Sequence, residues 1–177
     1  MLILHKRQGG MSLIEIIISM TVLVIVMALG IPSFYEWVQN QQIRAGAEAI
    51  MNGLQLARSE AIQRNLTVKF VVAPPGTGWT VSESTSGTQI QARNAAEGTS
   101  NAVVTVTPLG ATTVTFAPLG GVTANADSSD TLTQVDVTNV VLTSTAARPI
   151  RIVVTGGGST RMCDPAATIA TTDPRHC

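Results

Sequence analysis

Residues 9–35 read GGMSLIEIIISMTVLVIVMALGIPSFY, and this stretch decides how the chain is organised. Its last 20 residues, 16–35, carry no charge and are mostly Ile, Val, Leu and Met. A helix of that length rises about 1.5 Å per residue and spans about 30 Å, the thickness of a bilayer core. The basic residues His5, Lys6 and Arg7 precede it. We therefore expect a membrane helix whose leading end stays in the cytoplasm while the bulk of the chain lies across the membrane.

A cleaved secretory signal is the alternative for this segment, because Ala28-Leu29-Gly30 is similar to a small-x-small cleavage site. The apolar run is long for a signal, however, and an acid, Glu15, stands at its start. A lone carboxylate in apolar surroundings costs on the order of several kcal/mol unless it is paired or protonated. Glu15 therefore either lies at the membrane interface, where its cost is small, or finds a cationic partner.

The heptapeptide GGMSLIE at residues 9–15 resembles the processing motif of type IV pilins and type II secretion pseudopilins. The resemblance implies that a prepilin peptidase cuts after Gly10 on the cytoplasmic side and that Met11 is then N-methylated. The family usually has Phe where this chain has Met11. The apolar segment would stay on the mature protein, and Glu15 would meet the terminal amine of a neighbouring subunit inside a filament.

The helical pattern continues beyond the apolar segment. Gly30 and Pro32 predict a kink or local unwinding near residues 30–33. Further along, apolar residues recur at alternating spacings of four and three, which predicts an amphipathic helix ending near Asn65. The positions of this apolar face are Ile43, Ala47, Ile50, Leu54, Ala57 and Ala61.

The sequence LQLARSEAI at residues 54–62 resembles a signature of the FimT/GspH branch, the minor pilins and minor pseudopilins. IPSF at residues 31–34 is similar to that branch as well, and the resemblance is strong over residues 9–72. Arg58 and Glu60 also fit a solvated helix face. Opposite charges four residues apart are expected on exposed faces. These pairs are Arg44 with Glu48 and Glu60 with Arg64.

After Asn65 the apolar period changes from helical to alternating, which predicts strands. The expected strands are Thr67–Val72, Trp79–Ser82, Ile90–Arg93, Ala102–Val106, Thr112–Phe116, Val135–Leu142 and Arg148–Thr155. Pro-Leu-Gly occurs at residues 108–110 and again at 118–120, which predicts consecutive hairpins. We expect an α+β fold of the type IV pilin kind, in which a long N-terminal helix packs on an antiparallel β-sheet domain.

The chain thus divides into five expected segments. They are a leader peptide at 1–10, a transmembrane or filament-core helix at 11–35, an amphipathic helix at 36–65, a β-rich domain at 66–155 and a C-terminal tail at 156–177.

The tail carries both cysteines, Cys163 and Cys177, and a local disulfide between them fits an oxidising compartment. The alternative is a metal site built from the two cysteines and His176, but such a site lacks a fourth ligand.

Residues of the usual catalytic kinds are scarce. Trimming after Gly10 would leave one histidine, His176, so a histidine-based triad is not expected. The sequence has no phosphate-binding glycine loop with a lysine. We therefore expect neither an enzyme nor a cofactor, and an ATPase that drives assembly would be a separate protein.

DNA binding is a second interpretation. Some FimT-like minor pilins bind DNA through a Gly-Arg-x-Arg element, and GSTR at residues 158–161 is similar to it, with Arg161 in the second arginine position. Arg148, Arg151 and Arg175 could extend a basic patch. The mature chain would have nine basic and eleven acidic residues, a formal charge of −2, which disfavours phosphate binding. The other interpretation is that these arginines are strand ends and ion-pair partners.

The resemblance implies a minor pilin that helps to initiate or assemble a type IV pilus. Two alternatives stay open: a pilus-associated DNA receptor for natural transformation, and a minor pseudopilin of a type II secretion system. The implied partners are other major and minor pilins, the prepilin peptidase, the inner-membrane assembly platform and, before assembly, membrane lipid. The implied location is the bacterial inner membrane, crossed once with the C-terminal domain in the periplasm, and then the pilus or pseudopilus.

Overall fold

The computed structural model describes residues 12–166, 169–170 and 172–177. Its contacts divide the chain into two compact units that meet between Tyr35 and Glu36. The described part of the first unit holds the beginning of one long helix, and the second unit holds the rest of that helix and the strands.

Helix α1 runs from Leu13 to Arg64 and has 52 residues. It stays helical through Gly30 and Pro32, so the local unwinding expected there is absent. A proline removes one backbone hydrogen bond from a helix, and here the turns on either side hold the ladder together. Residues 13–35 are exposed throughout. Among the described residues, α1 is the one helix long and apolar enough to cross a membrane.

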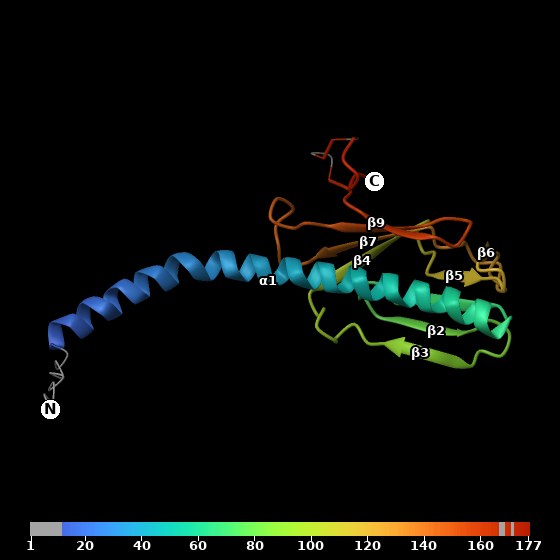
Figure 1. Ribbon diagram of the computed structural model, residues 1–177, viewed down its shortest axis with the longest axis horizontal. Helices are drawn as coiled ribbons and strands as arrows, with labels where there is room; N and C mark the ends of the chain where they lie inside the picture. The colour runs from blue at the N-terminus through green and yellow to red at the C-terminus, as the bar shows by residue number, and fades with distance from the viewer. Residues whose placement is uncertain (1–11, 167–168, 171) are drawn as a thin grey trace, which may run out of the picture. The chain divides into compact units, whose positions relative to one another are not determined.

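In the part of the chain that the structure describes, nine strands follow α1 and form two antiparallel sheets (Figure 1). The first sheet has the order β3-β2-β1-β5-β6, formed by Gln89–Arg93, Trp79–Glu83, Val68–Val72, Thr113–Phe116 and Val122–Thr123. The second sheet has the order β4-β7-β8-β9, formed by Ala102–Thr107, Gln134–Asn139, Ile150–Val154 and Thr160–Cys163. This architecture confirms the expected α+β fold, with the β-structure split between two sheets.

The two Pro-Leu-Gly turns differ in what they connect. The turn at residues 118–120 joins the antiparallel strands β5 and β6, so the hairpin expected there is present. The turn at residues 108–110 joins β4 to β5, which belong to different sheets, so the hairpin expected there is wrong. Strands β6 and β9 were not among the expected strands. The C-terminal tail was expected to begin at the three glycines, residues 156–158. They instead turn the chain so that β9 pairs with β8.

The hydrophobic core lies between the second half of α1 and the sheets. All the apolar positions singled out by the helical spacing are fully buried, as listed: Ile43, Ala47, Ile50, Leu54, Ala57 and Ala61. They belong to one cluster with side chains from both sheets, such as Phe70 of β1 and Val137 of β7. Gly53 lets the helix come close, because a Cβ atom there would lie 2.7 Å from the Phe70 ring and 2.8 Å from Trp79.

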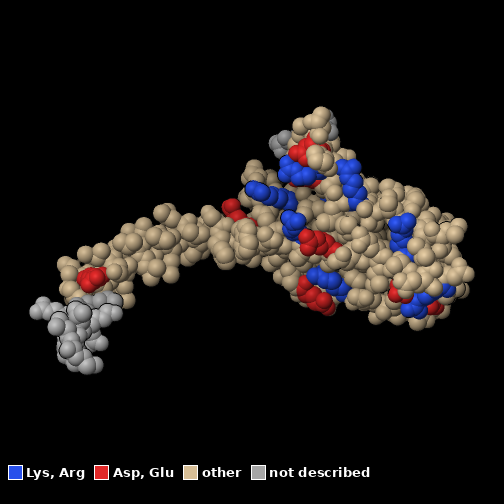
Figure 2. Space-filling view, viewed as in Figure 1, with Lys and Arg blue, Asp and Glu red and all other residues tan. Residues whose placement is uncertain are grey.

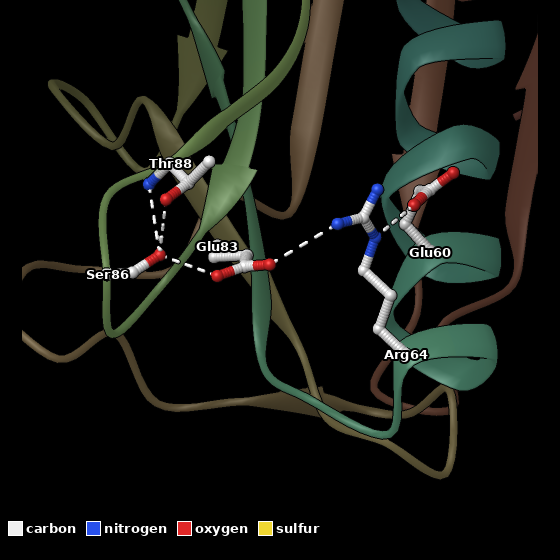
Figure 3. Close-up of polar contacts among 5 residues, drawn as sticks. All are labelled: Glu60, Arg64, Glu83, Ser86 and Thr88. Atoms are coloured by element: carbon white, nitrogen blue, oxygen red, sulfur yellow. Dashed lines mark hydrogen bonds and ion pairs between the residues drawn. The ribbon is translucent and has the colours of Figure 1, made fainter.

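An ion-pair network fixes the end of α1 to the first sheet (Figure 3). The Arg64 Nε atom lies 2.5 Å from Glu60 Oε2, and its Nη1 atom lies 3.3 Å from Glu83 at the end of β2. Ser86 in the β2–β3 turn donates to the other Glu83 oxygen at 2.6 Å. Asn65 then takes a left-handed conformation with φ 53°, which ends the helix where the sequence predicted.

Candidate functional site

The first candidate surface is the apolar stem, residues 13–35. Its Leu, Ile, Val and Met side chains are exposed, for example Leu13 at 77% and Leu29 at 76%. Glu15 lies in the first turn of α1 and is exposed among them. No ion pair among the described residues includes Glu15. Water is a poor solvent for so large an apolar surface, so the stem needs lipid or other protein around it. Gly10 and Met11 lie outside the described residues.

A set of amide side chains, which we call the amide clamp, attaches the start of the second unit to the second sheet. The Oε1 atom of Gln39 accepts hydrogen bonds from Asn101 Nδ2 at 3.1 Å and from Asn139 Nδ2 at 3.0 Å. The Oε1 atom of Gln42 accepts from the backbone N of Asn101 at 3.2 Å. Gln39 and Asn139 are buried, and buried amides without partners are costly, so each of these residues depends on the others.

Asn40 extends this attachment by one position. Its Nδ2 atom donates to the Ala146 carbonyl at 3.0 Å, and its Oδ1 atom accepts from the Arg148 backbone N at 2.9 Å. The loop before β8 is therefore held to the first helical turn of the second unit.

Two of the four arginines considered for DNA binding are paired with acids. Arg151 and Asp136 face each other across β8 and β7, with their atoms 2.6 and 3.0 Å apart. The hydrogen bonds that Arg151 donates to the Asp136 carboxylate raise the pKa of Arg151. Arg175 lies 2.8 Å from Asp173, and its hydrogen bonds lower the pKa of the Asp173 carboxyl to about 2.

The other two arginines, Arg148 and Arg161, are exposed. Arg161 donates to the carbonyl of His176 and so attaches the tail. On the face drawn in Figure 2, basic and acidic side chains of the second unit are intermixed. The structure therefore does not gather these four residues into one unpaired basic patch, which supports their interpretation as strand ends and ion-pair partners.

The tail is closed by the disulfide between Cys163 and Cys177, whose Cα atoms are 5.1 Å apart. The disulfide consumes both thiols, so the alternative metal site with His176 has no thiolate to offer. Backbone contacts support the closure, since the Asp164 N donates to the Arg175 carbonyl at 2.7 Å.

Sequence reasoning missed a pocket of about 370 Å³ beside Arg58. The helix contributes Gln55, Arg58, Ser59 and Ile62 to its wall, and the opposite side is formed by Gly158 and Ser159 of the β8–β9 turn and by Thr160, the first residue of β9. Arg58 is half-buried rather than a member of a solvated face, and its Nε atom donates to the Gly120 carbonyl at 2.9 Å. In the sequence, Arg58 stands out only through its place within LQLARSEAI. That motif indicates a helix, but it does not indicate which distant residues Arg58 contacts.

Comparisons with known proteins agree with this architecture. The family described as type II transport protein GspH matches residues 46–158, and the prokaryotic N-terminal methylation motif matches residues 5–31. The chain therefore belongs to the GspH family, within the minor pilins and pseudopilins. No protein of curated function matches the sequence.

Among solved structures, the chain is similar to the type IV minor pilin FimU of Pseudomonas aeruginosa, with 14% identity and a TM-score of 0.51. The similarity covers 77% of this chain and 97% of that one. A second crystal form of FimU gives 14% identity and a TM-score of 0.48, with 72% and 97% of the two chains covered. At this identity the likeness concerns the fold, which is that of a pilin.

Proposed function

We propose that this protein is a minor subunit of a type IV pilus that helps to initiate or assemble the filament. Processing after Gly10 and methylation of Met11 would give the mature subunit, which crosses the inner membrane once with residues 36–177 in the periplasm. The observation that carries the proposal is the exposed apolar stem with Glu15 as its one acid. In a filament, stems of neighbouring subunits would cover this surface, and the new terminal amine of one would neutralise Glu15 of another.

The test compares Glu15→Ala with Glu36→Ala, which removes an exposed acid from the same helix just outside the stem. We expect both variants to insert into the membrane. Only Glu15→Ala should lose incorporation into sheared filaments, by about tenfold or more, because an unpaired terminal amine would then be buried in apolar surroundings. Immunoblots of membrane and filament fractions measure both quantities. Normal incorporation of Glu15→Ala would contradict the role given to this acid.

A minor pseudopilin of a type II secretion system is the second candidate, and the family description favours it. The fold likeness to a type IV minor pilin favours the pilus. Deleting the gene separates the two. Loss of surface pili with normal secretion of exoproteins supports the pilus, and the reverse supports the secretion system.

A further inference from the structure

The pocket beside Arg58 lies where the turn that contains Gly158 comes close to the turn that contains Gly120. Gly158, at φ +76°, lies so near Gly120 that a Cβ atom on it would be 1.9 Å from the Gly120 carbonyl oxygen and 3.2 Å from Arg58 Nε. The same carbonyl oxygen accepts the Arg58 Nε hydrogen bond. The Gly120 carbonyl thus fixes the guanidinium through Nε at the wall of the pocket, and the Gly158 turn lies next to it.

The charge of this guanidinium is not used within the part of the chain that the structure describes. The ion pairs among those residues involve Arg44, Arg64, Arg151 and Arg175, and not Arg58. Fixing Nε leaves the two terminal nitrogens as donors, which suits a planar anion with two oxygens. The amide of Gln55 and the hydroxyl of Thr160 add polar groups to the lining.

We propose that this pocket receives an acidic side chain, Asp or Glu, of another pilin-type subunit and so forms a contact between globular units. The proposal rests on the function proposed above, since it takes its occupant from the same filament. A carboxylate can form a bidentate pair with the fixed guanidinium. The volume of about 370 Å³ leaves room for the side chain and part of its backbone.

The surroundings of the pocket favour a protein over a nucleic acid. Ile62 in its wall is 51% exposed, and Leu119, next to Gly120, is 96% exposed. Apolar side chains around a buried ion pair are typical of protein interfaces. Nucleic-acid sites instead gather several cations, whereas the mature chain would carry a formal charge of −2.

The test neutralises the positive charge of Arg58 without removing the side chain. Gln55→Glu places a carboxylate three residues before Arg58 on the same helix, a spacing that permits an ion pair, and it keeps the hydrogen bond to Gly120. Gln63→Glu is the matched control, because it makes the same change at an exposed position of the helix that does not line the pocket. Both variants should insert, fold and melt as the parent protein does.

The first measurement uses the processed full-length protein in detergent micelles and follows the NMR signal of Arg58 Nε–H. Titration with N-acetylglutamate should shift this signal in the parent protein and in Gln63→Glu. The response should fall at least tenfold in Gln55→Glu. No shift in the parent, or an equal shift in Gln55→Glu, overturns the proposal, as does a larger response to a short DNA oligonucleotide at the same concentration.

The second measurement is made in cells with a photoreactive amino acid at Ser159, which lies in the wall of the pocket. Mass spectrometry of the adduct should show a peptide of a prepilin with an Asp or Glu at the cross-link, and Gln55→Glu should reduce its yield at least tenfold. An adduct with any other class of molecule overturns the proposal. If Gln55→Glu behaves as the parent while Glu15→Ala fails to incorporate, the pocket assignment fails and the proposed function stands. If gene deletion leaves pili unchanged, the proposed function itself fails.

Discussion

Gly158 and Gly120, which are 38 positions apart in the chain, approach each other so closely that a methyl group on Gly158 would overlap the Gly120 carbonyl oxygen. We predict that Gly158→Ala lowers the free energy of unfolding by about 2 kcal/mol or more, because it adds both this overlap and a left-handed conformation that Ala avoids. Thermal or urea unfolding measures the loss. Gly156→Ala is the control, since a Cβ atom there meets nothing within 4 Å. Equal stability of the two variants would contradict the packing described.

The amide clamp gives a second prediction. Gln39→Ala removes the acceptor shared by the half-buried Asn101 and the buried Asn139, and leaves Asn139 Nδ2 with only the longer contact, 3.5 Å, to the backbone carbonyl of residue 39. We expect a loss of about 1–3 kcal/mol in the free energy of unfolding. Gln41→Ala, at an exposed neighbouring position, should change it by less than about 0.5 kcal/mol. Urea titrations of both variants provide the comparison. An unchanged free energy of unfolding in Gln39→Ala would show that water replaces the hydrogen bonds of the amide clamp.

Removing the disulfide should affect the tail more than the core. Replacing both Cys163 and Cys177 with Ser opens a loop with a sequence separation of 14. The loop-entropy model gives about 3 kcal/mol as an upper limit for the loss. Because the core cluster lies outside the tail, we expect limited proteolysis to cut within residues 164–177 while the rest of the second unit stays intact. Cleavage spread evenly over the strands would contradict this expectation.

The tail should also respond to acid. The pKa of Asp173 falls from 3.8 to about 2, chiefly through its hydrogen bonds to Arg175. A lowered folded-state pKa means that the contact stabilises the tail above pH 3.8 and is lost as the pH falls toward 2. The NMR signal of Arg175 Nε–H should therefore stay constant from pH 7 to pH 4 and change between pH 4 and pH 2. In Asp173→Asn this transition should be absent.

Local patterns in the sequence were enough to predict the helix and its buried face. The spacing of Ile43, Ile50 and Leu54 requires a helix with one apolar side, and the change of period after Arg64 marks its end. Seven of the nine strands described by the structure were predicted for the same reason, since alternation is a local property, whereas β6 and β9 were not. The division of the strands into two sheets could not be predicted. The pairing of β1 with β5, and of β4 with β7, joins segments that are distant in sequence.

The pocket could not be predicted for a related reason. The sequence places Arg58 on α1, but its partner Gly120 is 62 positions away and the opposite wall comes from the β8–β9 turn. The three glycines at 156–158 begin the segment that was expected to be a C-terminal tail. The conformation of Gly158 and its contact with Gly120 make the same residues a tight turn instead.

The amide clamp also bears on how such a subunit carries a mechanical load. A pull transmitted along α1 enters the second unit at Glu36 and reaches Gln39, Asn40 and Gln42 within two helical turns. These side chains connect the helix to strands β4 and β7 and to the loop before β8, so tension spreads into the second sheet at once. Tension along the helix would thus strain several amide contacts together at the point where the core residue Ile43 is also buried.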